Sequence, residues 1–332
     1  MTQPTTVNMT FDTSLVDVKQ TPPPSNETVS FTSTTASDST IEMPPAPNPA
    51  PTKPIQHIPT QAAYNQWASI YDTDGNILQA IDDLELSSLL PALLSSVSSS
   101  AGTGGEGGNE INMLDLGCGT GRNTAKLLRH AWGARRVNVV GLDFSEKMLG
   151  VAGGKLGNLV EGQGEDGRVK VELRLECCDC FPTATISPTS TSITATSPLP
   201  HPLQALPPFN LTISTLVLEH IPLAPFFATL SATLAPGGVA LVTNMHEDMG
   251  RSSQAGFLRE DGVKVRGRSW VYGIEEVMEC ARGVGLEVKE VKERAVGKED
   301  LGVNGSWGLG DRGRKWVGVR VWVGFVFVKR GV

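Results

Sequence analysis

Glycines alternate with other residues at the end of an apolar run in residues 111–121, which read Ile-Asn-Met-Leu-Asp-Leu-Gly-Cys-Gly-Thr-Gly. The apolar part predicts a buried strand ending near Asp115, and the glycines at 117, 119 and 121 predict a tight turn. Glycine has no Cβ, so such a turn can bend sharply and approach a ligand closely. Residues 122–131 have helical character. A glycine-rich turn between a strand and a helix is the usual nucleotide site of an open α/β sheet.

A second acid, Asp143, ends the β-branched run Val137–Asp143, 22 positions after Gly121. This is close to the offset of about 20 residues at which a carboxylate meets ribose hydroxyls in doubly wound folds. A carboxylate accepts two hydrogen bonds and so suits a ribose diol. The alternative is an N-cap for the next helix, a role that Ser145 can also fill. We therefore expect Asp143 to bind a ribose.

The glycine spacing is Asp-x-Gly-x-Gly-x-Gly, which differs from the Gly-x-Gly-x-x-Gly fingerprint of nicotinamide enzymes. It resembles the first motif of class I S-adenosylmethionine-dependent methyltransferases, and Phe144–Met148 is similar to that family's Asp-x-Ser-x-x-Met segment. The resemblance covers residues 60–330 except for two inserts, and it implies S-adenosyl-L-methionine as the cofactor. The cofactor-binding residues that it implies are Tyr71, Asp115, Gly117, Gly119, Gly121, Asp143, Phe144, Met148, Asp179, Cys180 and Thr215.

Residues 169–176 alternate as a half-exposed strand should, and Cys-Cys-Asp-Cys follows at 177–180. In the resembled family, the acid at this strand end binds the adenine amino group and the next backbone amide meets the ring, roles that would fall to Asp179 and Cys180. Three clustered cysteines could also indicate a metal site. Zinc sites, however, pair two such clusters or add histidines at fixed spacing. No second Cys-x-x-Cys exists in the sequence, so we expect no metal.

Residues 209–222 resemble the family's fourth motif, a strand followed by the start of a helix near the reacting methyl group. Many relatives open this strand with Asp, whereas this chain has Asn210. A turn at 235–238 then leads into a fifth strand at 239–244. An acceptor hydroxyl would need a base, and the candidates near these strand ends are Glu219, His220 and His246. A lone histidine is more often structural than catalytic; His57 and His201 fall in low-complexity stretches, and His130 is remote from the strand ends.

Tyr64, Trp67 and Tyr71 precede the sheet at a spacing that places them on one helical face. One interpretation is that they pack this helix onto the core. The other is a resemblance to the Tyr-x-x-Trp-Ala-x-x-Tyr-Asp opening of small-molecule methyltransferases, including the ubiquinone-biosynthesis type. That segment covers the cofactor and helps to form the acceptor pocket. The two interpretations are not exclusive.

The pattern of elements predicts an α/β, Rossmann-like fold. We expect a seven-stranded, mainly parallel sheet with helices on both faces, a C-terminal antiparallel hairpin and an N-terminal helical cap. Near the C-terminus, residues 273–283 read as a helix, and residues 286–296 and 316–328 read as strands. Their connection, 297–314, should be an exposed loop. The expected domains are a disordered tail at 1–56, the cap at 57–94, a linker at 95–108 and the methyltransferase domain at 109–332. A low-complexity insertion at 183–208 is a surface segment or, alternatively, a lid.

The chain has 332 residues and a formal net charge of −7, which disfavours a nucleic-acid partner. The basic run Lys264–Arg268 reads as a solvated turn. The sequence shows no run of about 20 apolar residues and no signal peptide, so we expect a cytoplasmic protein without membrane insertion. The leading function is methyl transfer to a small-molecule acceptor, on oxygen or carbon. The alternatives are a protein or RNA methyltransferase and a non-catalytic S-adenosylmethionine-binding protein. The sequence indicates neither the acceptor nor the oligomeric state.

Overall fold

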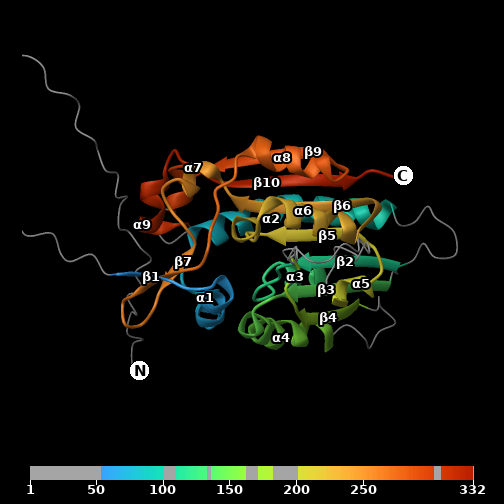
Figure 1. The fold of residues 1–332 in the computed structure, drawn as a ribbon, viewed down its shortest axis with the longest axis horizontal. Coiled ribbons are helices and arrows are strands. Elements are labelled where there is room, and N and C mark those ends of the chain that lie inside the picture. Colours follow the sequence, from blue (N-terminus) through green and yellow to red (C-terminus); the bar gives the residue numbers. More distant parts are fainter. Residues whose placement is uncertain are drawn as a thin grey trace, which may run out of the picture.

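The computed structural model describes residues 54–100, 110–132, 136–161, 171–181, 201–302 and 308–331. Seven strands form one sheet in the order β4-β3-β2-β5-β6-β10-β9 (Figure 1). Strands β4, β3, β2, β5 and β6 are parallel, and β10 runs antiparallel to both β6 and β9. Their bounds are β2 Glu110–Leu116, β3 Arg136–Asp143, β4 Val171–Cys177, β5 Phe209–Thr215, β6 Leu234–Met245, β9 Leu286–Ala295 and β10 Arg320–Lys329. The expected α/β fold, with its mainly parallel sheet and antiparallel hairpin, is confirmed.

The strand order reverses between β2 and β5, because the chain first moves outward through β3 and β4 and then returns to the other side of β2. Open α/β sheets bind ligands beyond the carboxyl ends of the strands at such a switch point. The glycine turn follows β2, and Thr215 ends β5. The fold therefore brings two of the sequence motifs to the same edge of the sheet.

Helices cover both faces of the sheet because its central strands are apolar on both sides. Ile111 and Met113 of β2 pack in one core cluster with α2, α3 and α4, whereas Leu114 and Leu116 pack in another with α6 and α8. Figure 1 shows these two layers around the sheet. The helices are α2 Ile77–Ser100, α3 Thr124–Arg129, α4 Glu146–Glu161, α6 Leu223–Thr233 and α8 Ile274–Gly283.

A small N-terminal lobe lies beside the switch point (Figure 1). It consists of α1 Thr60–Trp67 and a three-stranded sheet in the order β1-β8-β7. The strands are β1 Ile55–His57, β7 Gly256–Leu258 and β8 Lys264–Arg266. The lobe thus joins segments that are about 200 residues apart in the sequence. The prediction of a solvated turn at Lys264–Arg268 is wrong, because residues 264–266 form the central strand of this sheet.

Several expected boundaries differ from the structure. Helix α2 continues to Ser100, so the linker expected at 95–108 begins inside a helix, and α2 packs on the large sheet rather than in the cap. β1 includes Ile55 and Gln56, which lie within the expected tail at 1–56. Helix α3 covers only part of residues 122–131, and β6 already begins at Leu234, before the expected turn. Residues 1–53 and 182–200, which contain most of the expected tail and insertion, lie outside the described residues.

The connection between β9 and β10 is partly buried rather than an exposed loop. The carboxylate of Asp300 is buried and pairs with Arg294 at 2.6 Å, and Leu309 and Trp316 pack in a core cluster with α2 residues. Trp316 lies in a 3-10 turn, so β10 begins four residues later than expected. The remaining short helices are α5 His201–Gln204, η1 Leu218–His220, α7 Glu247–Gly250, η2 Glu299–Leu301, α9 Gly310–Gly313 and η3 Arg314–Trp316. Within the described ranges, no helix is long and apolar enough to cross a membrane.

Candidate active site

The glycine turn uses the left-handed backbone region at all three of its glycines, with φ of 81° at Gly117, 54° at Gly119 and 76° at Gly121. A Cβ at Gly117 would lie 2.5 Å from a methyl carbon of Val217, and one at Gly121 would lie 2.7 Å from a methyl carbon of Leu156. These two glycines therefore allow close packing of the turn. A Cβ at Gly119 would meet no described atom within 4 Å, because this residue faces a cavity.

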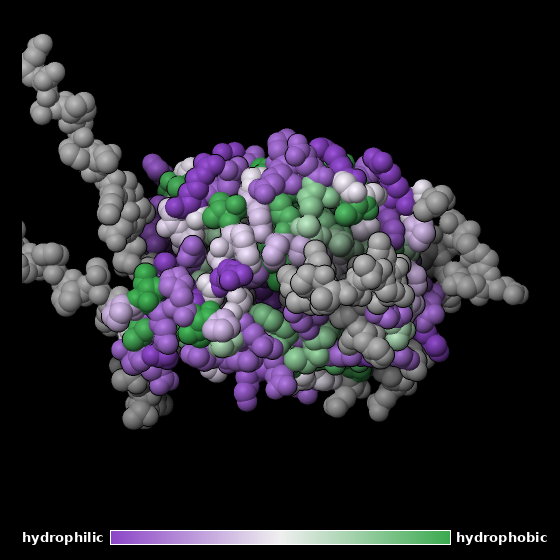
Figure 2. All heavy atoms as spheres, in the orientation of Figure 1, coloured by the Kyte–Doolittle hydropathy of each residue, from purple (hydrophilic) through white to green (hydrophobic). Residues whose placement is uncertain are grey.

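That cavity has a volume of about 790 Å³ and lies where the carboxyl ends of β2, β3, β4 and β5 meet the N-terminal lobe. Figure 2 shows this face of the molecule hollowed next to the lobe. The lining contains most of the residues implied by the family resemblance. Gly117, Gly119, Asp143, Phe144, Asp179, Cys180 and Thr215 lie on its sheet side, and Tyr71 comes from the segment after α1. Of the same set, Asp115, Gly121 and Met148 are buried outside the lining.

Asp143 ends β3 with its side chain in the cavity lining. Its carboxylate accepts hydrogen bonds from the backbone amides of Gly119, at 2.9 Å, and Ser145, at 2.8 Å. Burial raises the pKa of Asp143 to about 6, although these amide bonds oppose the shift. The Ser145 hydroxyl accepts a bond from the amide of Met148 and so caps helix α4. Asp143 therefore both orders the glycine turn and presents a carboxylate to the cavity.

Asp115, near the end of β2, links the strand before the glycine turn to the helix after it. Its Oδ2 accepts a hydrogen bond from the Thr124 hydroxyl at 2.6 Å, and burial raises its pKa to about 7. Its Oδ1 is buried without a hydrogen-bond partner among the described residues. Such an atom is costly unless a ligand or water satisfies it.

Leu216 is strained in a way that the sequence did not reveal. Its φ is 58°, a left-handed conformation that non-glycine residues rarely adopt and that often marks functional sites. The amide of Leu216 donates to the carbonyl of Thr243 at 2.9 Å, which fixes this conformation at the end of β5. The turn places Val217 against Gly117, and both Leu216 and Val217 line the cavity.

His220 lies in the lining, and the hydrogen bonds of its ring assign its tautomer. Nδ1 is 2.8 Å from the carbonyl oxygen of Arg268, so Nδ1 must carry the proton. Nε2 is then an acceptor, and it lies 2.7 Å from the hydroxyl of Tyr64, which donates to it. Glu219, the neighbouring candidate, is buried with one carboxylate oxygen 3.7 Å from Nε2, and burial raises its pKa.

His246 is placed apart from this cavity. The ring is fully buried and caps helix α7, because Nδ1 accepts from the amide of Asp248 at 3.0 Å. Nε2 lies 2.7 Å from a carboxylate oxygen of Glu293, to which it donates. Both ring nitrogens are thus engaged in holding α7 against β9, and the structure does not bring His246 together with His220.

Among the aromatic residues of the N-terminal segment, one packs in the core and two line the cavity. Helix α1 ends at Trp67, so Tyr71 lies beyond it, yet the three rings still form a cluster with centroids 5.0–6.0 Å apart. Trp67 is buried, stacks on Phe257 and donates to Asp74 at 2.7 Å. Tyr64 and Tyr71 instead line the cavity. His57, which its low-complexity surroundings had set aside, also lines it.

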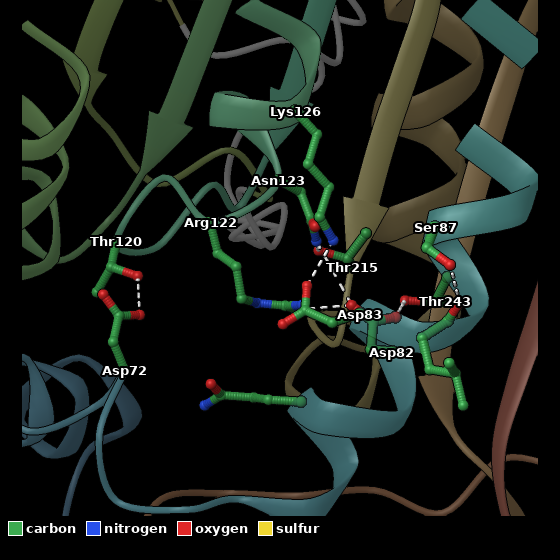
Figure 3. Close-up of polar contacts among 12 residues, drawn as sticks. Asp72, Asp82, Asp83, Ser87, Thr120, Arg122, Asn123, Lys126, Thr215 and Thr243 are labelled. Atoms are coloured by element: carbon green, nitrogen blue, oxygen red, sulfur yellow. Dashed lines mark hydrogen bonds and ion pairs between the residues drawn. The ribbon is translucent and has the colours of Figure 1, made fainter. Parts of the chain in front are cut away.

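An ionic network that the sequence analysis missed holds α2 against the glycine turn (Figure 3). Arg122 donates to Asp82 at 2.6 Å and to Asp83 at 2.7 Å, and Lys126 also pairs with Asp83. Asp82 is fully buried and accepts further bonds from Thr243 and Trp322. Asn123 extends the network to Thr215 in the cavity lining. In the sequence, the adjacent acids Asp82 and Asp83 and the bases Arg122 and Lys126, four residues apart, are the pattern that could have indicated this network.

Comparisons with known proteins show the family of the chain. A family model described as a methyltransferase domain matches residues 85–291. An uncharacterized methyltransferase of Emericella nidulans is 39% identical over 282 residues, which are 81% of this chain and 91% of that protein. The chain therefore belongs to the methyltransferase domain family, and it is a methyltransferase.

Two solved structures with similar folds are a (4+2)-cyclase, SpnF, and an S-adenosylmethionine-dependent methyltransferase of Clostridium acetobutylicum. The first is 14% identical with a TM-score of 0.46, and the match covers 84% of this chain and 100% of that one. The second is 14% identical with a TM-score of 0.44 and covers 81% and 99%.

The site fits S-adenosylmethionine. The open space over Gly119 leaves the backbone of the turn accessible, and the buried Asp143 carboxylate faces the same space. When bound, S-adenosylmethionine supplies a methyl group on a positively charged sulfur, ready for in-line displacement by a nucleophile.

Proposed function

We propose that this methyltransferase acts on a small-molecule acceptor and methylates an oxygen or carbon atom. The observation that carries the proposal is the second wall of the cavity, called here the acceptor wall. It is formed by the N-terminal lobe and the start of α6, and it contains His57, Ile58, Pro59, Thr60, Tyr64, His220, Ile221, Pro222, Gly267, Arg268 and Trp270. The cavity of about 790 Å³ lies in the upper part of the range of about 300–1,000 Å³ that small-molecule sites occupy. A second small molecule beside the cofactor would use this space.

On the opposite wall, we assign the residues according to the family resemblance. Asp143 would accept hydrogen bonds from the ribose, and Asp179 and the amide of Cys180 would meet the adenine. Phe144 and Tyr71 would flank the cofactor, while Asp115, Gly121 and Met148 would support it from behind the lining. Thr215, held by Asn123 at 2.8 Å, would lie near the reacting end.

The contribution of the chain is then to orient the acceptor, exclude water and remove a proton. For an acceptor hydroxyl, His220 is the base that we propose, because its Nε2 lone pair is turned toward the cavity-lining Tyr64 hydroxyl. An acceptor hydroxyl that displaces Tyr64 from Nε2 would give its proton to that nitrogen. The bond from Nδ1 to the Arg268 carbonyl holds the ring in this orientation and stabilises the resulting imidazolium.

A fractionation experiment tests the acceptor class. The full chain is incubated with S-adenosylmethionine labelled in its methyl group and with a cell extract separated into small-molecule, protein and RNA fractions. We expect label to enter a small-molecule product. Label that appears in the protein or RNA fraction would overturn the proposal. His220→Asn should lower turnover of a hydroxyl acceptor by about 100-fold to 10,000-fold while S-adenosylhomocysteine affinity stays the same.

A further inference from the structure

Three cysteines surround Asp179 at the end of β4, and two of them have their sulfur atoms close together. The Sγ atoms of Cys178 and Cys180 are 3.5 Å apart, within hydrogen-bond distance for thiols. Both residues line the cavity on the sheet side, and both are free cysteines. The third, Cys177, is exposed and directs its thiol to the carbonyl of Phe144 instead.

We propose that Cys178 and Cys180 form a reversible disulfide when the protein meets a hydroperoxide, and that this bond closes the adenine end of the cavity. The part of this proposal that concerns cofactor affinity rests on the proposed cofactor site, whereas the part that concerns the disulfide does not.

The environment gives the two thiols different roles. The hydrogen bond from the Cys180 thiol holds the pKa of Cys178 below its usual value, against the effect of burial and of nearby carboxylates. The same contact, together with burial, raises the pKa of Cys180. Cys178 is half-buried at the cavity, whereas Cys180 is only 3% exposed. Because the thiolate is the nucleophile, Cys178 is the thiol that a small oxidant in the cavity meets first.

The chemistry balances with hydrogen peroxide as the oxidant. The Cys178 thiolate attacks one peroxide oxygen, the O–O bond breaks, and a sulfenic acid and hydroxide form. The Cys180 sulfur then attacks the sulfenic sulfur, the S–S bond forms and the S–O bond breaks. The second hydroxide takes the Cys180 proton, and the first takes the proton that Cys178 had released. Two thiols are oxidised to one disulfide, and one peroxide is reduced to two water molecules.

Forming this bond must move the cavity wall. A disulfide has an S–S distance of about 2.0 Å, so the two sulfur atoms must approach by about 1.5 Å. Cys180 resists the movement, because its carbonyl accepts a bond from the Thr229 hydroxyl at 3.0 Å and the next residue, Phe181, stacks on Phe226. The displacement therefore falls on Cys178 and Asp179. Asp179 is the residue assigned to the adenine amino group, so the oxidised site should bind the cofactor less well.

Mass spectrometry and calorimetry together test the proposal. The reduced full chain is treated with hydrogen peroxide, remaining thiols are alkylated, and the protein is mapped by peptide mass spectrometry without reduction. We expect two fewer alkylated cysteines and a Cys178–Cys180 linkage. Titration with S-adenosylhomocysteine should show an affinity loss of about tenfold or more, reversed by dithiothreitol, and saturating S-adenosylhomocysteine should slow the oxidation.

Single variants supply the controls. Cys177→Ser should respond to peroxide as the natural sequence does. In Cys178→Ser and Cys180→Ser, S-adenosylhomocysteine affinity should no longer change on treatment. A linkage through Cys177, or full alkylation of both thiols after treatment, would overturn the disulfide. A disulfide that leaves S-adenosylhomocysteine affinity unchanged would overturn its effect on the cavity. If the reduced protein does not bind S-adenosylhomocysteine at all, the cofactor site fails, and the mapped linkage still decides the disulfide.

Discussion

The sheet side of the cavity comes from turns that directly follow strands β2, β3, β4 and β5, and each of these turns carries a short motif. The acceptor wall combines residues 220–222, which follow β5, with residues 57–64 and 267–270, which meet because β1 pairs with β8 and α1 contacts β8. The first wall is encoded locally, and the second depends on contacts between distant segments. Sequence motifs should therefore be informative about the cofactor and nearly silent about the acceptor.

The largest effect should follow a change in the locally encoded wall. Gly119→Val places a branched side chain in the open space over the turn, at a φ of 54° that valine rarely adopts. We expect S-adenosylhomocysteine binding to become undetectable by calorimetry. The matched control is Gly150→Val, at an exposed position of α4 with free space for a Cβ. Normal binding by the Gly119 variant would show that the turn does not contact the cofactor.

The second prediction concerns a contact that no motif indicates. Asp82→Ala removes the buried acceptor shared by Arg122, Thr243 and Trp322. Two buried donors, the Thr243 hydroxyl and the Trp322 indole, then lose this partner, and Arg122 keeps only its pair with Asp83. Losing one partner of a buried pair costs about 3–5 kcal/mol of folding free energy. Chemical denaturation should show a loss of this size, while Asp261→Ala, which removes an exposed ion pair, should show no measurable change. Equal stability of the two variants would show that the network contributes little.

The third prediction uses the raised pKa of Asp143. A ribose donates to the carboxylate form, so S-adenosylhomocysteine affinity should fall as pH drops below about 6 and the carboxyl gains a proton. The free energy of unfolding changes in the opposite direction. Because the pKa of Asp143 in the folded state exceeds the ordinary 3.8, this group adds stability as pH falls from about 6 toward 3.8. Asp143→Asn should weaken binding by about 1–3 kcal/mol.

The same variant is the control for the pH profile. Asp74 and Asp115 also have raised pKa values, of about 6 and about 7, so the natural protein can show more than one transition. The affinity change that Asp143 causes must disappear in Asp143→Asn. A profile that keeps its step near pH 6 in this variant would assign the step to another carboxyl group.

The difference between the walls also explains what the sequence could predict. The succession of strands along the chain and the position of Asp143 at a strand end follow from apolar runs and glycine spacing, which act over a few residues. The β7–β8 pair was missed because its strands have three residues each and join β1 across the chain. The left-handed Leu216 and the His220 tautomer arise from tertiary hydrogen bonds to Thr243 and Arg268. No local pattern encodes such contacts.

The smallest expected effect tests the wall that depends on distant contacts. Tyr64→Phe removes only the hydroxyl that donates to Nε2 of His220 and leaves the aromatic cluster in place. A bond of this kind is worth about 0.5–1.5 kcal/mol, and the acceptor hydroxyl must displace it to reach Nε2. Without it, the KM for the acceptor should fall by about tenfold or less, and S-adenosylhomocysteine affinity should not change. Steady-state kinetics with a hydroxyl acceptor identified by the labelling experiment measures this. Tyr272→Phe is the matched control: it also removes a single tyrosine hydroxyl, but Tyr272 does not line the cavity and its hydroxyl donates to the backbone carbonyl of Ile221 rather than to His220. If the Tyr64 variant weakens S-adenosylhomocysteine binding while leaving the KM for the acceptor unchanged, Tyr64 belongs to the cofactor wall, and the division of the cavity into two walls fails at this residue.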